Sequence, residues 1–113
     1  MNHRMVRAGS AVLTLIALVL TAAATTQAQD AAALFKTKCA VCHAADGSGS
    51  SQMGKQLGAN DLRSDGVQKQ TDAQLTESIT NGKGKKMPAY KGKLTDAQIT
   101  QLVDYIRDLA KKK

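Results

Sequence analysis

With 113 residues and a formal net charge of +7, the chain has room for one small domain and carries an excess of basic side chains. Only 3% of its residues are aromatic and none is tryptophan, so a core built from these side chains alone is small. Domains of this size usually need a disulfide, a metal or a cofactor for stability. The positive charge favours binding to an acidic protein surface, to nucleic acid or to anionic lipid. The scarcity of aromatic residues and the lack of a recognised motif argue against nucleic acid.

The N-terminal segment has the three parts of a secretory signal peptide. Arg4 and Arg7 give it a basic start, and residues 11–20 form an apolar run. Small residues at Thr26 and Ala28 then predict cleavage after Ala28. The apolar run is short for a membrane span, which needs about 20 such residues.

We therefore expect residues 1–28 to be removed and residues 29–113 to form the single exported domain, a soluble periplasmic protein without stable membrane insertion. Cleavage at Ala24 is an alternative. An uncleaved signal would instead tether the domain to the outer face of the inner membrane. Cleavage removes two arginines and no acidic residue, which lowers the net charge of +7 by two.

The first element of the remaining chain is a helix predicted over residues 30–39, which are rich in alanine. Asp30 near its start favours the positive end of the helix dipole. Four glycines are spread through residues 46–60, and this spacing predicts a loop.

Two later helices share one start signal. Residues 71–74 and 95–98 both read Thr-Asp-Ala-Gln, which fits a capping box. Asn81-Gly82 ends the first of these helices. In the second, apolar residues recur at helical spacing on one face: Ile99, Leu102, Val103, Ile106 and Leu109. No alternating run is long enough for a strand, so we expect an all-α domain of three to five helices with long loops.

The sequence Cys39-Ala40-Val41-Cys42-His43 has the C-x-x-C-H spacing of covalent haem attachment. Two thiols at the end of a helix can both reach one edge of a haem and form thioethers. The adjacent histidine then projects toward the iron. One haem c, bound through Cys39 and Cys42 with His43 as iron ligand, is the expected cofactor.

Other uses of a cysteine pair fit less well. A thioredoxin-like redox pair needs a βαβ context, which this sequence lacks. A closed zinc site needs four ligands, and here Cys39, Cys42 and His43 would need a carboxylate crowded beside them. A disulfide between cysteines so close in sequence constrains the unfolded chain little.

The second axial ligand is expected to be a methionine. His3 lies in the signal peptide, so the mature chain has no second histidine to offer. Met53 follows His43 closely in the glycine-rich segment, whereas Met87 is far enough away in sequence to approach from the opposite face. We expect Met87 to bind the iron with His43, and Met53 to serve in packing or in the loop.

This order of elements resembles that of small bacterial class I cytochromes c: a helix ending in C-x-x-C-H, a Met-Pro loop and a C-terminal helix. The resemblance implies a cytochrome c-like fold around one haem, in which the first and last helices cross. Phe35 matches the aromatic residue of the first helix, Leu102 and Tyr105 match the pair on the last, and Ala31 stands where a small residue allows close approach.

The sequence departs from the usual pattern of this family in the residues expected to orient His43. Many members have a proline soon after the haem motif, and a carbonyl of that loop fixes the histidine through its Nδ1–H. Here the only proline is Pro88, so the sequence identifies no acceptor for His43.

An iron ligated by His43 and Met87 has no vacant position, so we expect an electron carrier and no enzyme. Lysines close in sequence to these ligands would steer the chain, as a monomer, onto acidic patches of membrane or periplasmic redox proteins. They are Lys36, Lys38, Lys55, Lys83, Lys85, Lys86, Lys91 and Lys93. The alternatives are a haem enzyme or ligand sensor in which Met87 is displaceable, and a cytochrome subunit of a larger oxidase or dehydrogenase.

Overall fold

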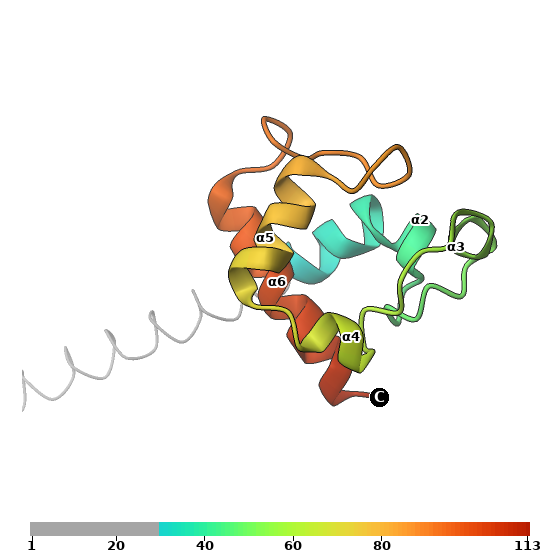
Figure 1. Ribbon diagram of the computed structural model, residues 1–113. Coiled ribbons are helices and arrows are strands. Elements are labelled where there is room, and N and C mark those ends of the chain that lie inside the picture. The colour runs from blue at the N-terminus through green and yellow to red at the C-terminus, as the bar shows by residue number, and fades with distance from the viewer. Residues whose placement is uncertain (1–29) are drawn as a thin grey trace, which may run out of the picture.

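The computed structural model describes residues 30–113, and the regular structure of this part of the chain is helical (Figure 1). Isolated bridges join Lys83 to Met87 and Lys91 to Leu94, without forming a sheet. The all-α prediction is confirmed. The predicted signal peptide lies outside the described residues. Within residues 30–113, no helix combines the length and the apolar character needed to cross a membrane.

The expected first helix is present as helical residues 30–38, followed after a turn at Cys39 by α2 (Ala40–His43). The backbone hydrogen bonds continue across this turn. The amide of Cys39 donates to the carbonyl of Phe35 at 2.9 Å, and the amide of His43 donates to that of Cys39 at 2.9 Å. Both cysteines and His43 are therefore carried by almost continuous helical backbone, which fixes their relative positions.

The predicted loop over residues 46–60 is wrong at its centre, where α3 (Gln52–Leu57) forms. The Ser51 hydroxyl accepts a hydrogen bond from the amide of Gly54 at 2.9 Å and so caps this helix. The same hydroxyl shares its hydrogen between the carbonyls of Val41 (2.8 Å) and Cys42 (2.9 Å). Because so short a helix is marginal by itself, its contact with α2 decides the conformation of this segment.

Gly54 allows α3 to touch α2, because a Cβ at this buried position would overlap the carbonyl oxygen of Cys42. We expect Gly54→Ala to lower the free energy of unfolding by about 1–3 kcal/mol. Gly66→Ala in α4 (Asp65–Gln68) is the matched control, since its nearest atom would be the Ser64 hydroxyl at 4.0 Å. Denaturant unfolding of the haem-loaded variants measures the free energy of unfolding of each. Equal stability of the two variants would contradict the role of this contact.

The two capping boxes are confirmed at the starts of α5 (Asp72–Asn81) and α6 (Asp96–Lys111). In each, the threonine hydroxyl accepts a hydrogen bond from the backbone amide of the glutamine at 3.1 Å. The side-chain oxygen of the glutamine accepts one from the backbone amide of the threonine at 2.9 Å. α5 ends before Gly82, as predicted. The two helices lie side by side (Figure 1).

The core confirms the predicted contact between the first and last helices. The Phe35 ring, only 2% exposed, lies against Tyr105 with ring centroids 5.1 Å apart. Ala31 and Leu102 are buried, as is the whole predicted apolar face of α6. Leu75 and Ile79 of α5 complete the same cluster. The core is thus built around α6, and its side toward α2 borders a cavity.

Candidate functional site

A cavity of about 220 Å³ opens between α2 and the segment that joins α5 to α6. Its lining includes Cys39, Cys42, His43 and Met87, the four residues predicted to hold a haem. A smaller chamber of about 60 Å³ shares three of these residues and reaches the core at Phe35. Segments far apart in sequence therefore meet around two neighbouring hollows, the smaller of which borders the core.

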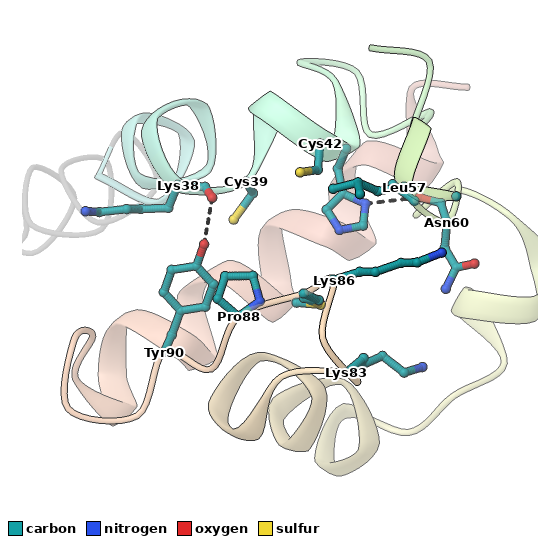
Figure 2. Close-up of a pocket in the computed structure, with 13 residues that line it drawn as sticks. Lys38, Cys39, Cys42, Leu57, Asn60, Lys83, Lys86, Pro88 and Tyr90 are labelled. Carbon is teal, nitrogen blue, oxygen red and sulfur yellow. Dashed lines mark hydrogen bonds between the residues drawn. The ribbon is translucent and has the colours of Figure 1, made fainter. Parts of the chain in front are cut away.

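The two cysteines lie in the same wall of the cavity, facing the segment that carries Lys86 and Pro88 (Figure 2). Both are free thiols. Burial, and to a lesser extent the neighbouring Cys42, raises the pKa of the Cys39 thiol to about 11. Redox-active C-x-x-C pairs need a lowered thiol pKa, so this environment does not suit thioredoxin-like chemistry. In residues 30–113, no group of three or more His, Cys, Asp or Glu side chains is placed to hold a metal ion, as the zinc alternative would require.

His43 is oriented by a main-chain carbonyl. Its Nδ1 lies 3.0 Å from the carbonyl oxygen of Asn60. Because that oxygen only accepts, Nδ1 carries the hydrogen of this bond, and in the neutral imidazole the lone pair available to a ligand is then on Nε2. Asn60 thus supplies the acceptor that the sequence did not identify. A backbone carbonyl belongs to every residue type, so no sequence signal marked it.

The two methionines occupy different surroundings. Met87 is half-buried and lines the cavity, where a tight turn pairs its backbone with that of Lys83. Met53 is 43% exposed on α3 and lines a separate shallow hollow beside Val41. The structure therefore brings Met87, and not Met53, together with the cysteines and His43.

Three of the predicted lysines line the cavity: Lys38, Lys83 and Lys86 (Figure 2). None of them forms a salt bridge with residues 30–113. The Tyr90 hydroxyl donates to the Lys38 carbonyl at 2.8 Å and so links the helical residues 30–38 to the segment after Met87. The lining of the cavity therefore carries basic side chains, and the bond from Tyr90 to Lys38 joins two of the segments that form it.

Comparison with known proteins establishes the family. Residues 26–106 match the family described as cytochrome c oxidase, cbb3-type, subunit III. The chain is 43% identical over 86 residues to cytochrome c6 of Leptolyngbya boryana, which covers 74% of this chain and 96% of that protein. The chain belongs to the class I cytochromes c.

Further relatives of this cytochrome are of two kinds. It is 36% identical to cytochrome c6 of a Picosynechococcus species, over 87% of this chain and 89% of that protein. It is 38% identical to the CcoP subunit of the cbb3-type oxidase of Azospirillum brasilense, but spans only 30% of that subunit. The solved structure of KustC0563, a c-type cytochrome, matches with a TM-score of 0.64 and 30% identity, over 69% of this chain and 94% of the other.

The residues around the cavity of this cytochrome fit a haem c. They provide two thiols, a methionine thioether and an imidazole whose Nε2 is not used by the bond to Asn60. The inner chamber is lined largely by apolar core residues, which suits a flat apolar ring.

Proposed function

We propose that this cytochrome carries single electrons on one haem c, attached through Cys39 and Cys42 and ligated by His43 and Met87. The observation that carries the proposal is the meeting of these four side chains in one cavity. A haem bound there supplies a one-electron couple between ferric and ferrous iron. The similarity to cytochromes c6 supports a carrier and not an enzyme.

Each side chain has its own part in this proposal. Cys39 and Cys42 hold the cofactor by thioethers, so that it stays with the protein during repeated encounters. His43 offers Nε2, with its ring orientation set by Asn60. Met87 offers a thioether, which favours a higher reduction potential than a second histidine. If His43 and Met87 both ligate the iron, small molecules such as oxygen or peroxide would find no open position.

The test is to characterise the full chain after expression with haem-maturation machinery. We expect haem that resists acidic acetone extraction, low-spin spectra in both oxidation states and a one-electron potentiometric titration. Carbon monoxide should not bind the reduced protein readily. Covalent haem with rapid carbon monoxide binding would favour the enzyme or sensor, and the absence of covalent haem would contradict the proposal itself.

Lys38, Lys83 and Lys86 support docking to acidic surfaces of redox partners, because they line the cavity that would hold the haem. We expect Lys86→Glu to slow oxidation by ferricyanide severalfold at low salt and to accelerate oxidation by a cationic cobalt complex. Lys112→Glu, at the end of α6 and outside the cavity lining, is the control of equal charge change. Equal effects of the two variants would show that net charge alone, and not the cavity lining, governs the rates.

We also propose that residues 1–28 are a cleaved signal peptide and that the protein acts as a soluble monomer in the periplasm. The basic and apolar parts of this segment support the proposal. Intact mass spectrometry of the periplasmic fraction should give a haem-bearing chain that begins at Gln29. A chain that keeps Met1 and sediments with membranes would support the tethered alternative.

The oxidase subunits among the relatives favour a second candidate function, a cytochrome subunit of a larger oxidase. The chain spans 30% and 28% of the two curated subunits that it resembles, CcoP and FixP. Purification from native membranes in mild detergent separates the two functions. Stable co-purification with an oxidase would favour the subunit, and recovery in the soluble fraction would favour the free carrier.

A further inference from the structure

Two loops meet beside His43, one over residues 44–49 after α2 and the other over residues 59–63 after α3. Main-chain hydrogen bonds join the first loop to the second and to α2. The amide of Leu62 donates to the carbonyl of Gly47 at 2.7 Å, and the amide of Gly49 donates to the carbonyl of His43 at 2.7 Å. The second loop contains Asn60, whose carbonyl accepts the hydrogen of His43 Nδ1. The position of that carbonyl therefore depends on how closely the two loops approach.

Gly49 lies at a close approach of the two loops. It is buried, with a left-handed φ of +74°, and a Cβ there would lie 2.6 Å from the carbonyl oxygen of Ala59. The same Cβ would lie 3.2 Å from the carbonyl oxygen of Asn60. Both atoms are backbone and have no rotamer with which to avoid the contact. A side chain at this position must therefore move the two loops apart, and with them the Asn60 carbonyl relative to His43.

Arg63 joins the same two loops through its side chain. Its Nε and Nη2 donate to the carboxylate of Asp61 at 3.0 and 3.1 Å. Its Nη1 lies 3.7 Å from the carboxylate of Asp46 in the other loop. Two features thus hold the Asn60 carbonyl in place. One is the close backbone contact at Gly49, and the other is the ion-pair network of Arg63, which includes Asp61, the residue after Asn60.

We propose that Gly49 is a positioning residue for the His43 ring. By allowing main chain to meet main chain, it holds the Asn60 carbonyl on the Nδ1 hydrogen and thereby sets how strongly the ring donates electrons through Nε2. The inference rests on the proposed function, in which Nε2 ligates the iron. A hydrogen bond at Nδ1 raises the basicity of a ligating histidine, which favours the ferric state. Weakening that bond should therefore raise the reduction potential.

The experiment compares Gly49→Ala with Gly92→Ala in the haem-loaded protein. Gly92 also has a left-handed φ, +79°, but a Cβ there meets nothing within 4 Å, so both variants carry similar backbone strain. NMR of the reduced protein measures solvent exchange of the His43 Nδ1 hydrogen, and potentiometry measures the reduction potential. For Gly49→Ala we expect exchange about five- to tenfold faster, as the loss of one hydrogen bond implies, and a higher potential. Gly92→Ala should match the wild type in both.

Wild-type exchange and potential in a folded Gly49→Ala protein would overturn the positioning role. If that variant does not fold, Arg63→Gln takes its place. We then expect faster exchange of the His43 Nδ1 hydrogen and a higher reduction potential, both by smaller amounts than for Gly49→Ala. Unchanged values in Arg63→Gln would then overturn the proposal. The optical spectrum of the wild type separates this outcome from failure of the proposed function: without a low-spin histidine-ligated haem, the proposed function fails first and the positioning role fails with it.

Discussion

Replacing Met87 by alanine should abolish the sulfur-to-iron charge-transfer band of the oxidised protein and lower its reduction potential. Met87 is half-buried in the cavity that also holds His43, and its thioether is the group expected to favour the ferrous state. Axial ligands and their surroundings spread haem potentials over about 0.8 V, so we expect a fall on the order of 0.1 V or more. Optical spectra and potentiometry of the haem-loaded variant measure both changes, and the opened position should bind carbon monoxide.

Met53→Ala is the matched control, because it removes the same thioether from outside the cavity. Met53 is 43% exposed on α3, a helix that Ser51 ties to the carbonyls of Val41 and Cys42. Met53 lines a hollow separate from the cavity that holds His43. Loss of the band in Met53→Ala, with the band retained in Met87→Ala, would assign the ligand to Met53 and contradict the proposed site.

The helices that could be predicted are those whose signals are local. The threonine and glutamine of each capping box lie three residues apart and satisfy each other's backbone, so the starts of α5 and α6 follow from the sequence. The apolar face of α6 repeats over several turns and is buried as expected. The C-x-x-C-H spacing likewise places its groups within one short segment. In each case the physical cause lies within a few residues.

The features that could not be predicted depend on contacts between distant segments. α3 is short and rich in polar residues. Its N-cap, Ser51, also donates a hydrogen bond to the carbonyl of Val41 in α2, ten residues earlier in the chain. The Asn60 carbonyl acquires its role only because two loops approach at Gly49. The glycines that suggested a loop are, at positions 49 and 54, sites of close backbone approach. A spacing of glycines indicates that the chain turns or comes close to itself, but does not distinguish the two.

The core and the cavity share residues, which links stability to the proposed site. Phe35 contacts Tyr105 of α6 and also lines the inner chamber next to Cys39 and His43. We expect Phe35→Ala to lower the free energy of unfolding of the haem-loaded protein by about 3–5 kcal/mol, because the ring is 2% exposed. Small domains have a total stability of about 5–15 kcal/mol, so this is a large part of it. Denaturant unfolding, followed by circular dichroism, measures the change.

Val41→Ala is the control for Phe35→Ala, since Val41 is 62% exposed and should cost less than about 0.5 kcal/mol. Phe35→Leu keeps much of the buried apolar volume and should fall between the two. A Phe35→Ala protein as stable as Val41→Ala would mean that the contact between the first and last helices contributes little. Under the proposed function, Cys39, Cys42, His43 and Met87 would then join these elements through a shared haem, without the Phe35–Tyr105 contact.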